Sequence, residues 1–239
     1  MGPRQAAGAS GSGGAADRPG TSKTLHHGLQ VLEALVGAPR GLSVTQIAES
    51  VGVHRTVAHR LVRTLEEHHL CRRLDDRRVV LGAGLVRLAE PVEQDLRILA
   101  RPVLEDLAAA TEATAHLVVR EDEERVRMLM IVEPRRARMH VAFRSGQVDP
   151  IDRGSAGLAI LAGEPPAEGE RAAVGRARQR GFAVSHGEIA AGISGISALV
   201  RAGGRSGLSL GLSVFEVEDE EALGRLVIGA AQRLAVALG

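Results

Sequence analysis

The 239-residue sequence contains one cysteine and no tryptophan, tyrosine or asparagine. The single Cys71 excludes a disulfide within the chain and any cysteine-rich zinc site. No apolar run approaches the ~20 residues of a membrane span, and the N-terminus lacks the hydrophobic core of a signal peptide. We therefore expect no membrane partner, no metal, no cofactor, and a cytoplasmic location.

Charge is distributed unevenly, although the formal net charge is only +1. Residues 21–82 hold nine Lys and Arg residues against six acids, together with six of the nine histidines. The remainder is near neutral or acidic. A local basic surplus is the electrostatic signature of nucleic-acid binding, so any such affinity is expected in the first third of the chain.

The segment from Ser43 to Gly52 predicts a short amphipathic helix. Ser43 and Gln46 have the spacing of a capping box, in which each side chain accepts a hydrogen bond from the other residue's backbone N–H. Apolar residues then recur at helical spacing, at Val44, Ile47, Ala48 and Val51. Gly52 suits the left-handed backbone that often ends a helix.

A second helix is expected from about His54. Its inward residues are expected to be Val57, Leu61, Val62 and Leu65, and its outward residues Arg55, Thr56, His59, Arg60 and Arg63. The major groove of B-DNA admits one α-helix and presents base edges that such side chains can read. The alternative is an ordinary solvated helix face, because exposed basic residues are common.

A short hairpin loaded with arginine favours the DNA-binding interpretation. Two strands, 70–74 and 77–81, are expected around Asp75 and Asp76. A helix-turn-helix followed by a basic ribbon is a winged helix, whose wing contacts phosphates or the minor groove. The candidate DNA contacts are Ser43, Thr45, Arg55, Thr56, Val57, His59, Arg60, Arg77 and Arg78.

The flanking segments complete the first half. Residues 1–20 are rich in Gly, Ala and Ser and are expected to be a disordered tail, or alternatively an arm that touches DNA through Arg4 and Arg18. Residues 25–36 predict the first helix of a three-helix core. Further helices are expected over 82–89 and from Val92 onward, where Pro102 predicts a kink.

The second half predicts an antiparallel sheet with helices. Strands are expected over 115–120, 125–133, 139–144, 182–186, 196–201 and 207–215, and helices over 154–162, 171–180 and 220–238. The overall fold class is therefore α+β.

Catalytic and metal motifs give little support for an enzyme. Residues 207–211 match G-x-S-x-G, but the alternating apolar pattern continues straight through Ser209, whereas a nucleophile elbow needs a sharp strand-to-helix turn. The histidines occur as adjacent pairs or at spacings that do not share a helix face, so they indicate charged surface rather than a metal site.

Four stretches resemble one protein family, in the same order along residues 22–238. They are VGVHRTVAHRLVRTL (51–65), LGAGLVRLA (81–89), GQVDPIDRGSAGLAILAG (146–163) and GFAVSHGEIAAGISGISALV (181–200). This pattern is similar to the isocitrate lyase regulator (IclR) family of bacterial transcription factors. The resemblance implies a winged helix-turn-helix over 21–82, linker and dimerisation helices over 83–108, and a GAF-like effector-binding domain over 109–239.

A ligand pocket is implied at the start of the helix expected over 154–162. Free N–H groups at a helix N-terminus attract a carboxylate, although tight packing explains the small residues there equally well. With the resemblance, the candidate pocket residues are His116, Met130, Arg144, Ser155, Ala156, Glu188, Ser194, Gly195, Ser197, Ser213 and Phe215. Glu188 is as well explained as an acceptor for loop N–H groups.

Departures from the family pattern bear on the effector. The family commonly has Asp near Ser185, Cys near Gly195 and Ser near Phe215, so this wall is larger and less polar. That favours a larger or more apolar organic acid, an aromatic acid among them, over a small keto acid. The wing, with Asp75-Asp76 as its tip, is also shorter than usual.

Two functions remain open from sequence. The first is a transcriptional regulator, not an enzyme, that binds a palindromic operator in double-stranded DNA and responds to a small organic acid. We expect it to be a homodimer, and a tetramer is also possible. The second is a winged-helix module for protein contacts or architectural DNA binding, with a vestigial sensor domain.

Overall fold

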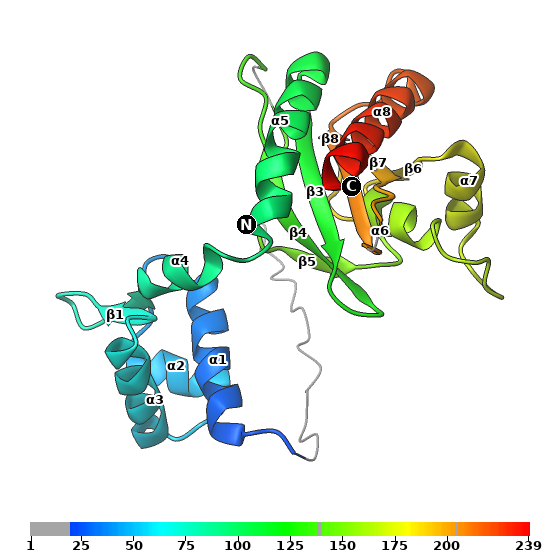
Figure 1. Ribbon diagram of the computed structural model, residues 1–239. Coiled ribbons are helices and arrows are strands. Elements are labelled where there is room, and N and C mark those ends of the chain that lie inside the picture. The colour runs from blue at the N-terminus through cyan, green and yellow to red at the C-terminus, as the bar shows by residue number, and fades with distance from the viewer. Residues whose placement is uncertain (1–19, 138–139, 204) are drawn as a thin grey trace, which may run out of the picture. The chain divides into compact units, whose positions relative to one another are not determined.

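The computed structural model describes residues 20–137, 140–203 and 205–239 (Figure 1). Almost all of the tail expected over 1–20, with Arg4 and Arg18, lies outside these residues. The chain divides into two compact units, one ending at Val92 and the other beginning at Glu93. In the described part of the chain no helix is long and apolar enough to cross a membrane.

The first unit is a three-helix core followed by a two-stranded hairpin and a short helix. Its elements are α1 (Lys23–Val36), α2 (Val44–Val51), α3 (Arg55–Glu67), β1 (Cys71–Arg73), β2 (Val79–Leu81) and α4 (Gly84–Ala89). Side chains from all three long helices and from the hairpin share one core, among them Leu35, Ile47, Val62 and Val79. This arrangement confirms the predicted helix-turn-helix with a wing.

The turn between α2 and α3 forms as its sequence predicts. The Ser43 hydroxyl accepts from the Gln46 N–H at 3.3 Å, and the Gln46 side chain accepts from the Ser43 N–H at 2.9 Å, which completes the capping box. Gly52 ends α2 with a φ of 71°, a left-handed conformation that a side chain would disfavour. His54 caps α3 by accepting from the Thr56 N–H at 3.4 Å.

The prediction that Val57 turns inward is wrong. Val57 is 38% exposed, whereas Ala58 is fully buried. The buried positions of α3 are Ala58, Leu61 and Val62, spaced three and four residues apart as a 3.6-residue period requires. Val57 falls about 100° away from that stripe and joins the outward residues.

The second unit contains one six-stranded antiparallel sheet in the order β5-β4-β3-β8-β7-β6. Its elements are α5 (Gln94–Thr111), β3 (Thr114–Arg120), β4 (Arg125–Val132), β5 (Val148–Pro150), α6 (Gly154–Leu161), α7 (Ala172–Arg180), β6 (Ala183–His186), β7 (Ser194–Leu199), β8 (Leu208–Val214) and α8 (Glu220–Leu238). The predicted α+β fold is confirmed.

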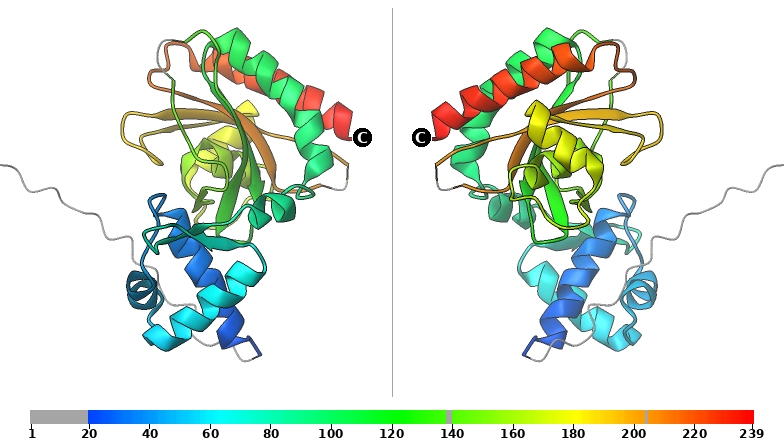
Figure 2. Two further views of the ribbon diagram at one scale, coloured as in Figure 1. Left: turned by 90° about the vertical axis from the view of Figure 1, so that its left-hand side faces the viewer. Right: turned by 90° about the vertical axis from the view of Figure 1, so that its right-hand side faces the viewer.

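Helices cover both faces of this sheet (Figures 1 and 2). Helices α5 and α8 lie against each other on one face, and α6 lies on the other face with α7 beside it. The main core lies under α5 and α8 and includes Leu104, Leu117, Ile196, Leu212 and Leu234. The segment expected to link the domains is thus divided, since α4 belongs to the first unit and α5 builds the core of the second.

The strand expected over 139–144 does not form. Met139 lies outside the described residues, and residues 140–144 form no strand, while the pairing edge of β4 is taken by β5. The apolar alternation that suggested a strand has another cause. Val141 is buried, with its carbonyl accepting from the Thr114 hydroxyl at 2.6 Å, and Phe143 contributes to a cavity wall.

Candidate DNA-binding face and ligand pocket

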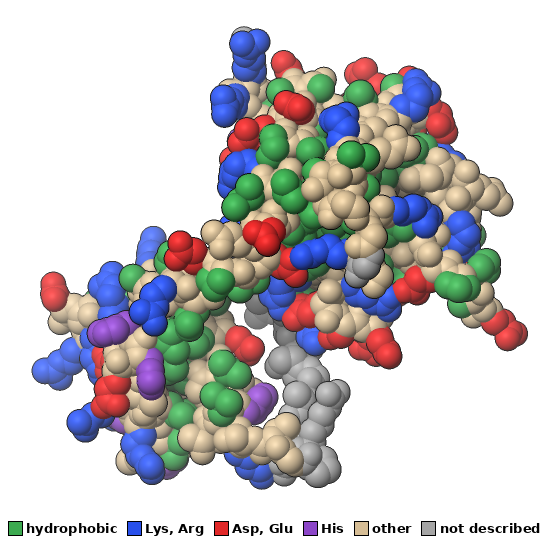
Figure 3. All heavy atoms as spheres, viewed as in Figure 1, with side chains coloured by type: hydrophobic (Ala, Val, Ile, Leu, Met, Phe, Trp, Pro, Cys, Tyr) green, Lys and Arg blue, Asp and Glu red, His purple; other side chains and the backbone are tan. Residues whose placement is uncertain are grey.

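The outward face of α3 is polar and basic. Arg55, Thr56, Val57, His59 and Arg60 are all exposed, and Figure 3 shows basic and histidine side chains gathered on the first unit. Within the described residues neither Arg55 nor Arg60 has an ion-pair or hydrogen-bond partner. Their charges serve no contact inside the described protein, so they are available to an anionic partner.

The hairpin carries four more arginines, which differ in their contacts. Arg73 is paired with Glu66 at 3.1 Å, and Arg78 with Asp76 at 3.3 Å. Arg72 and Arg77 are exposed, and neither has such a pair among the residues that the structure describes. Of the two wing residues predicted to contact DNA, Arg77 is therefore free to bind a phosphate. Arg78 would first have to break its ion pair with Asp76.

The two candidates on α2 also differ. Thr45 is exposed in the first turn of the helix. Ser43 is half-buried, and its hydroxyl already accepts from the Gln46 N–H. Ser43 therefore acts as a helix cap, and only its hydroxyl hydrogen remains for a DNA phosphate.

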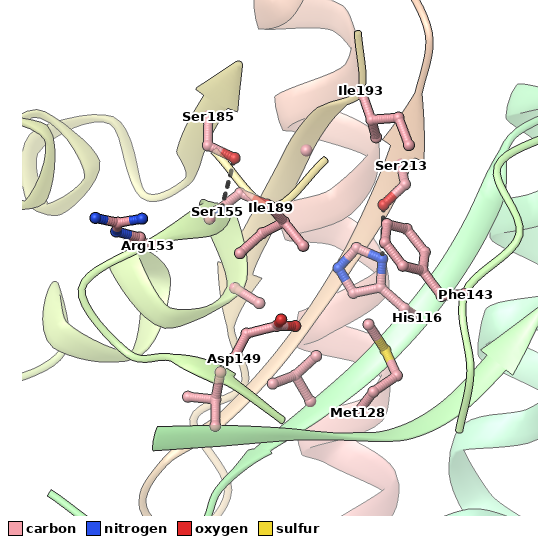
Figure 4. Close-up of a pocket in the computed structure, with 15 residues that line it drawn as sticks. His116, Met128, Phe143, Asp149, Arg153, Ser155, Ser185, Ile189, Ile193 and Ser213 are labelled. Atoms are coloured by element: carbon pink, nitrogen blue, oxygen red, sulfur yellow. Dashed lines mark hydrogen bonds between the residues drawn. The ribbon is translucent and has the colours of Figure 1, made fainter. Parts of the chain in front are cut away.

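The second unit has a pocket of about 490 Å³, counted with its open mouth, between α6 and the sheet (Figure 4). That volume includes all the space between the walls and open solvent at the mouth, and the part that can hold the centre of a water-sized molecule is about 40 Å³. The pocket is lined by His116, Val118, Val126, Met128, Phe143, Asp149, Arg153, Gly154, Ser155, Ala156, Ser185, Ile189, Ile193, Gly195 and Ser213. Five of the predicted pocket residues are among them, namely His116, Ser155, Ala156, Gly195 and Ser213.

The sequence of β8 explains the floor of the pocket. Leucines at 208, 210 and 212 face the core under α5 and α8, while Ser209, Gly211 and Ser213 alternate with them toward α6. His116 pairs in register with Gly211. A side-chain carbon on Gly211 would lie 2.8 Å from His116 Nε2, so the glycine makes room for the imidazole ring.

His116 is the buried polar centre of this floor. Its Nε2 lies 3.3 Å from the Ser197 hydroxyl and its Nδ1 3.4 Å from the Ser213 hydroxyl, and the Ser155 and Ser197 hydroxyls are 2.8 Å apart. Burial lowers the pKa of His116 from its usual 6.5 to about 4. The ring is therefore neutral at physiological pH and acts as both donor and acceptor toward the serines.

The N-terminus of α6 is already partly occupied by side chains. The Gly154 N–H donates to Glu188 at 2.9 Å, and the Ser155 N–H donates to the Ser185 hydroxyl at 2.9 Å. Arg171 holds the same Glu188 carboxylate at 2.7 and 3.0 Å and lowers the pKa of that carboxyl. Glu188 thus acts as an acceptor for a backbone N–H group and does not line the pocket.

The remaining predicted residues do not line the pocket either. Ser197 lies behind it and supports His116 and Ser155, while Ser194 is bonded to His186 at 3.0 Å. Arg144 is exposed, and Phe215 is 47% exposed beyond the end of β8, where the alternation of the strand no longer applies.

Met130 is displaced by an irregularity in the sheet. Leu117 pairs with Met130 but Val118 pairs with Met128, so a bulge skips one residue of β4. Strict alternation would put both methionines on one face, whereas the bulge sends Met130 into the core under α5 and leaves Met128 on the pocket wall. The sequence carries no signal for that bulge.

Sequence reasoning missed several lining residues. Most are apolar side chains from β3, β4, the segment before β5 and the loop after β6, namely Val118, Val126, Met128, Phe143, Ile189 and Ile193. Asp149, Arg153 and Ser185 were also missed. The alternation of Ser and Gly with Leu in β8 is the one pattern that marks the α6 face before the structure is known.

Catalytic and metal alternatives gain no support from the described residues. Ser209 is fully buried within β8, with its strand continuing on both sides, as the alternation predicts. No group of three or more His, Cys, Asp or Glu residues is placed to hold a metal ion in the part of the chain that the structure describes.

Two family models match the chain in order. The IclR helix-turn-helix domain matches residues 24–75, and the C-terminal domain of bacterial IclR transcriptional regulators matches residues 91–176. The first match covers the α3 face and the second ends within α7, so that it includes α6 and most of the apolar pocket wall.

Curated relatives are regulators as well. The chain is 29% identical over 149 residues to the transcriptional regulator TtgV of Pseudomonas putida, covering 62% of this chain and 57% of that protein. It is 27% identical over 151 residues to the glycerol operon regulatory protein of Streptomyces coelicolor, covering 62% and 59%. The matched part thus spans less than two thirds of either relative.

Solved structures match over nearly the whole chain. An IclR regulator from Alicyclobacillus acidocaldarius is 26% identical with a TM-score of 0.78, covering 92% of this chain and 100% of that one. An IclR homologue from Microbacterium hydrocarbonoxydans, complexed with 4-hydroxybenzoate, is 21% identical with a TM-score of 0.76, covering 90% and 99%. The winged helix and both family matches agree: the chain belongs to the IclR family of bacterial transcriptional regulators.

Proposed function

We propose that this regulator binds a palindromic operator as a homodimer through α3 and the wing, and that a small organic acid in the α6 pocket changes its operator affinity. One observation carries the proposal most directly. Arg55 and Arg60 project from the recognition helix with no partner among the described residues. A charged side chain that no internal contact uses is suited to a phosphate or to a guanine edge.

The homodimer follows from geometry rather than from any contact seen in one chain. A single recognition helix reads only one half-site, and a two-fold protein matches a palindrome. Helix α4 exposes Val86 (72%) and Leu88 (56%), and α5 exposes Ile98 (61%). Exposed apolar side chains on these helices support an interface there, as proposed for the linker segment.

The organic acid is supported by the donors in the pocket. Because the Ser185 hydroxyl accepts from the Ser155 N–H, its own hydrogen is free to donate to a ligand, and the Ser213 hydroxyl lines the same pocket. The positive end of the α6 dipole stabilises an anion at the same place. The apolar remainder of the wall suits a ring, and a structural relative holds 4-hydroxybenzoate.

The test begins with an operator selected from random duplexes. Gel shifts are then repeated with aromatic and aliphatic acids added. Ala156→Leu fills the pocket from α6, and Ala172→Leu adds the same atoms to an exposed site on α7 as a matched control. We expect the acid to alter operator affinity in wild type and in the control but not in Ala156→Leu.

Two outcomes would contradict the proposal. Selection that enriches no sequence would favour the architectural or protein-contact module. A selected operator whose binding no acid changes, or an acid response that survives in Ala156→Leu, would remove the α6 pocket from the switch.

A further inference from the structure

One carboxylate side chain, that of Asp149, lies on the pocket wall. Asp149 lies in the middle of β5, the edge strand of the sheet, and pairs in register with Val126. It is half-buried, and Figure 4 shows its carboxylate directed into the cavity, on the same side as His116. Its place on the edge strand and its partial burial together hold this carboxylate at the cavity.

The contacts of Asp149 leave much of its accepting capacity unused. Its hydrogen-bond partner among the described residues is the Gln147 side-chain amide, whose nitrogen lies 3.0 and 3.1 Å from the two oxygens. A carboxylate offers about four lone-pair sites. No Arg, Lys or His within the described ranges forms an ion pair with it.

The other ionisable groups of the wall do not neutralise this charge. His116 is neutral, as its lowered pKa requires. Arg153 is exposed, and in Figure 4 its guanidinium points away from the cavity. The neighbours that share the cavity with Asp149 are mostly apolar, including Val126, Met128 and Ile189.

This arrangement discriminates among acids. An ionised carboxylate can only accept hydrogen bonds, so a ligand without a donor at that end would leave it desolvated and unpaired. A ligand that turned its own carboxylate toward Asp149 would add like-charge repulsion. The serine hydroxyls can adapt to donor or acceptor, whereas Asp149 cannot.

From this geometry we infer that the effector is a hydroxy- or amino-substituted acid, and that Asp149 is the residue that selects the hydroxyl or amino group. The inference rests on the proposed function, because it assumes that the effector is an acid held in the α6 pocket. The acid group then lies at the serine end of the pocket and the donor group at the β5 end. Asp149 determines specificity and Ser185 determines orientation.

The experiment uses matched pairs of acids on the full-length protein. The probes are benzoate with 4-hydroxybenzoate and 4-aminobenzoate, and cyclohexanecarboxylate with 4-hydroxycyclohexanecarboxylate. Calorimetry measures their affinity for wild type, Asp149→Leu, Asp149→Asn, and Asp152→Leu. Asp152 is exposed outside this pocket, three residues further along, and serves as the matched control.

We expect wild type and Asp152→Leu to bind the substituted member of a pair about 10- to 100-fold more tightly than the plain acid, the range for a hydrogen bond to a charged group. In Asp149→Leu the preference should vanish or reverse, and in Asp149→Asn, which keeps one acceptor, it should be intermediate. The neutral variants should also bind plain benzoate more tightly than wild type does.

Contrary results separate this inference from the proposed function. Acids that bind wild type without preferring a donor, or a preference unchanged in Asp149→Leu, would overturn the role of Asp149 and leave the acid-responsive regulator standing. If no acid of either kind binds wild type, the inference falls together with the proposed effector class.

Discussion

The α3 face and the α6 pocket use polar side chains in opposite ways. On α3, Arg55 and Arg60 are exposed and have no ion-pair or hydrogen-bond partner among the described residues, so their contacts within a complex form only when a partner binds. At the pocket, Ser155, Ser213 and His116 are buried and are linked by hydrogen bonds to one another or to Ser197 behind them. Removing a group from the first region should change binding alone, whereas removing one from the second should change folding as well.

The largest expected effect is on the packing of the pocket floor. In Gly211→Ala the new methyl would lie 2.5 Å from the Ile196 carbonyl oxygen and 2.8 Å from His116 Nε2. Because backbone cannot give way as a flexible side chain can, we expect a loss of about 3 kcal/mol or more in the second unit. Hydrogen exchange in urea measures the stability of each unit separately.

Gly52→Ala is the matched change in the first unit. Gly52 has a φ of 71° and no atom within 4 Å of an added carbon, so only the left-handed backbone is strained, at about 1 kcal/mol. If Gly52→Ala and Gly211→Ala lower the free energy of unfolding of their units by equal amounts, the pocket floor around Gly211 is not tightly packed.

On the DNA-binding face, replacing an arginine side chain by alanine should leave the stability of the fold unchanged. Arg55→Ala or Arg60→Ala should weaken operator binding about 10- to 100-fold, as expected for one bidentate base contact, with no change in melting temperature. Fluorescence anisotropy with the selected operator measures the affinity. Arg176→Ala, an exposed arginine of α7, should bind like wild type. Operator affinities that match wild type in both α3 variants would remove α3 from base recognition.

The buried histidine makes the second unit sensitive to pH. His116 has a pKa of about 4 when folded and near 6.5 when unfolded. The unfolded chain therefore takes up a proton first, so stability is highest above about pH 6.5 and falls as the pH decreases toward 4. Between pH 7 and 5 the expected loss is about 2 kcal/mol.

His116→Gln should flatten this pH dependence, because the side chain no longer titrates. Urea unfolding at several pH values makes the comparison. If the free energy of unfolding falls with decreasing pH as steeply in the variant as in wild type, another group is responsible for the pH dependence.

The smallest effect is expected at the helix cap of α2. Ser43→Ala removes the acceptor for the Gln46 N–H and should cost the first unit about 1 kcal/mol. Ser50→Ala, in the last turn of the same helix, should cost less than about 0.5 kcal/mol. Similar losses in the two variants would argue against the capping role, and hydrogen exchange again reports on the first unit alone.

The difference between the regions also explains what the sequence could reveal. The α3 face follows from local periodicity, since Ala58, Leu61 and Val62 turn inward and the arginines must then turn outward. The one error, at Val57, came from choosing the wrong residue to begin the buried stripe.

The pocket, in contrast, depends on residues distant in sequence. His116 meets Ser197 and Ser213, 81 and 97 residues away, so no local window contains the cluster. The bulge that exchanges Met130 for Met128 and the placement of Phe143 and Asp149 arise from pairing and packing across the sheet. Only the family resemblance brought residues such as Ser155 and Ser213 together in advance.

The central claim is that the pocket and the operator are coupled. Coupling between two sites is reciprocal and typically amounts to about 1–3 kcal/mol. Calorimetry should therefore measure the affinity of the preferred acid for free protein and for protein saturated with operator, beside the operator affinity with and without that acid. The operator should change the affinity for the acid by some factor, and the acid should change the affinity for the operator by the same factor. We predict that these two factors agree, at about 5- to 150-fold. An acid that binds free and operator-bound protein equally well would contradict the account.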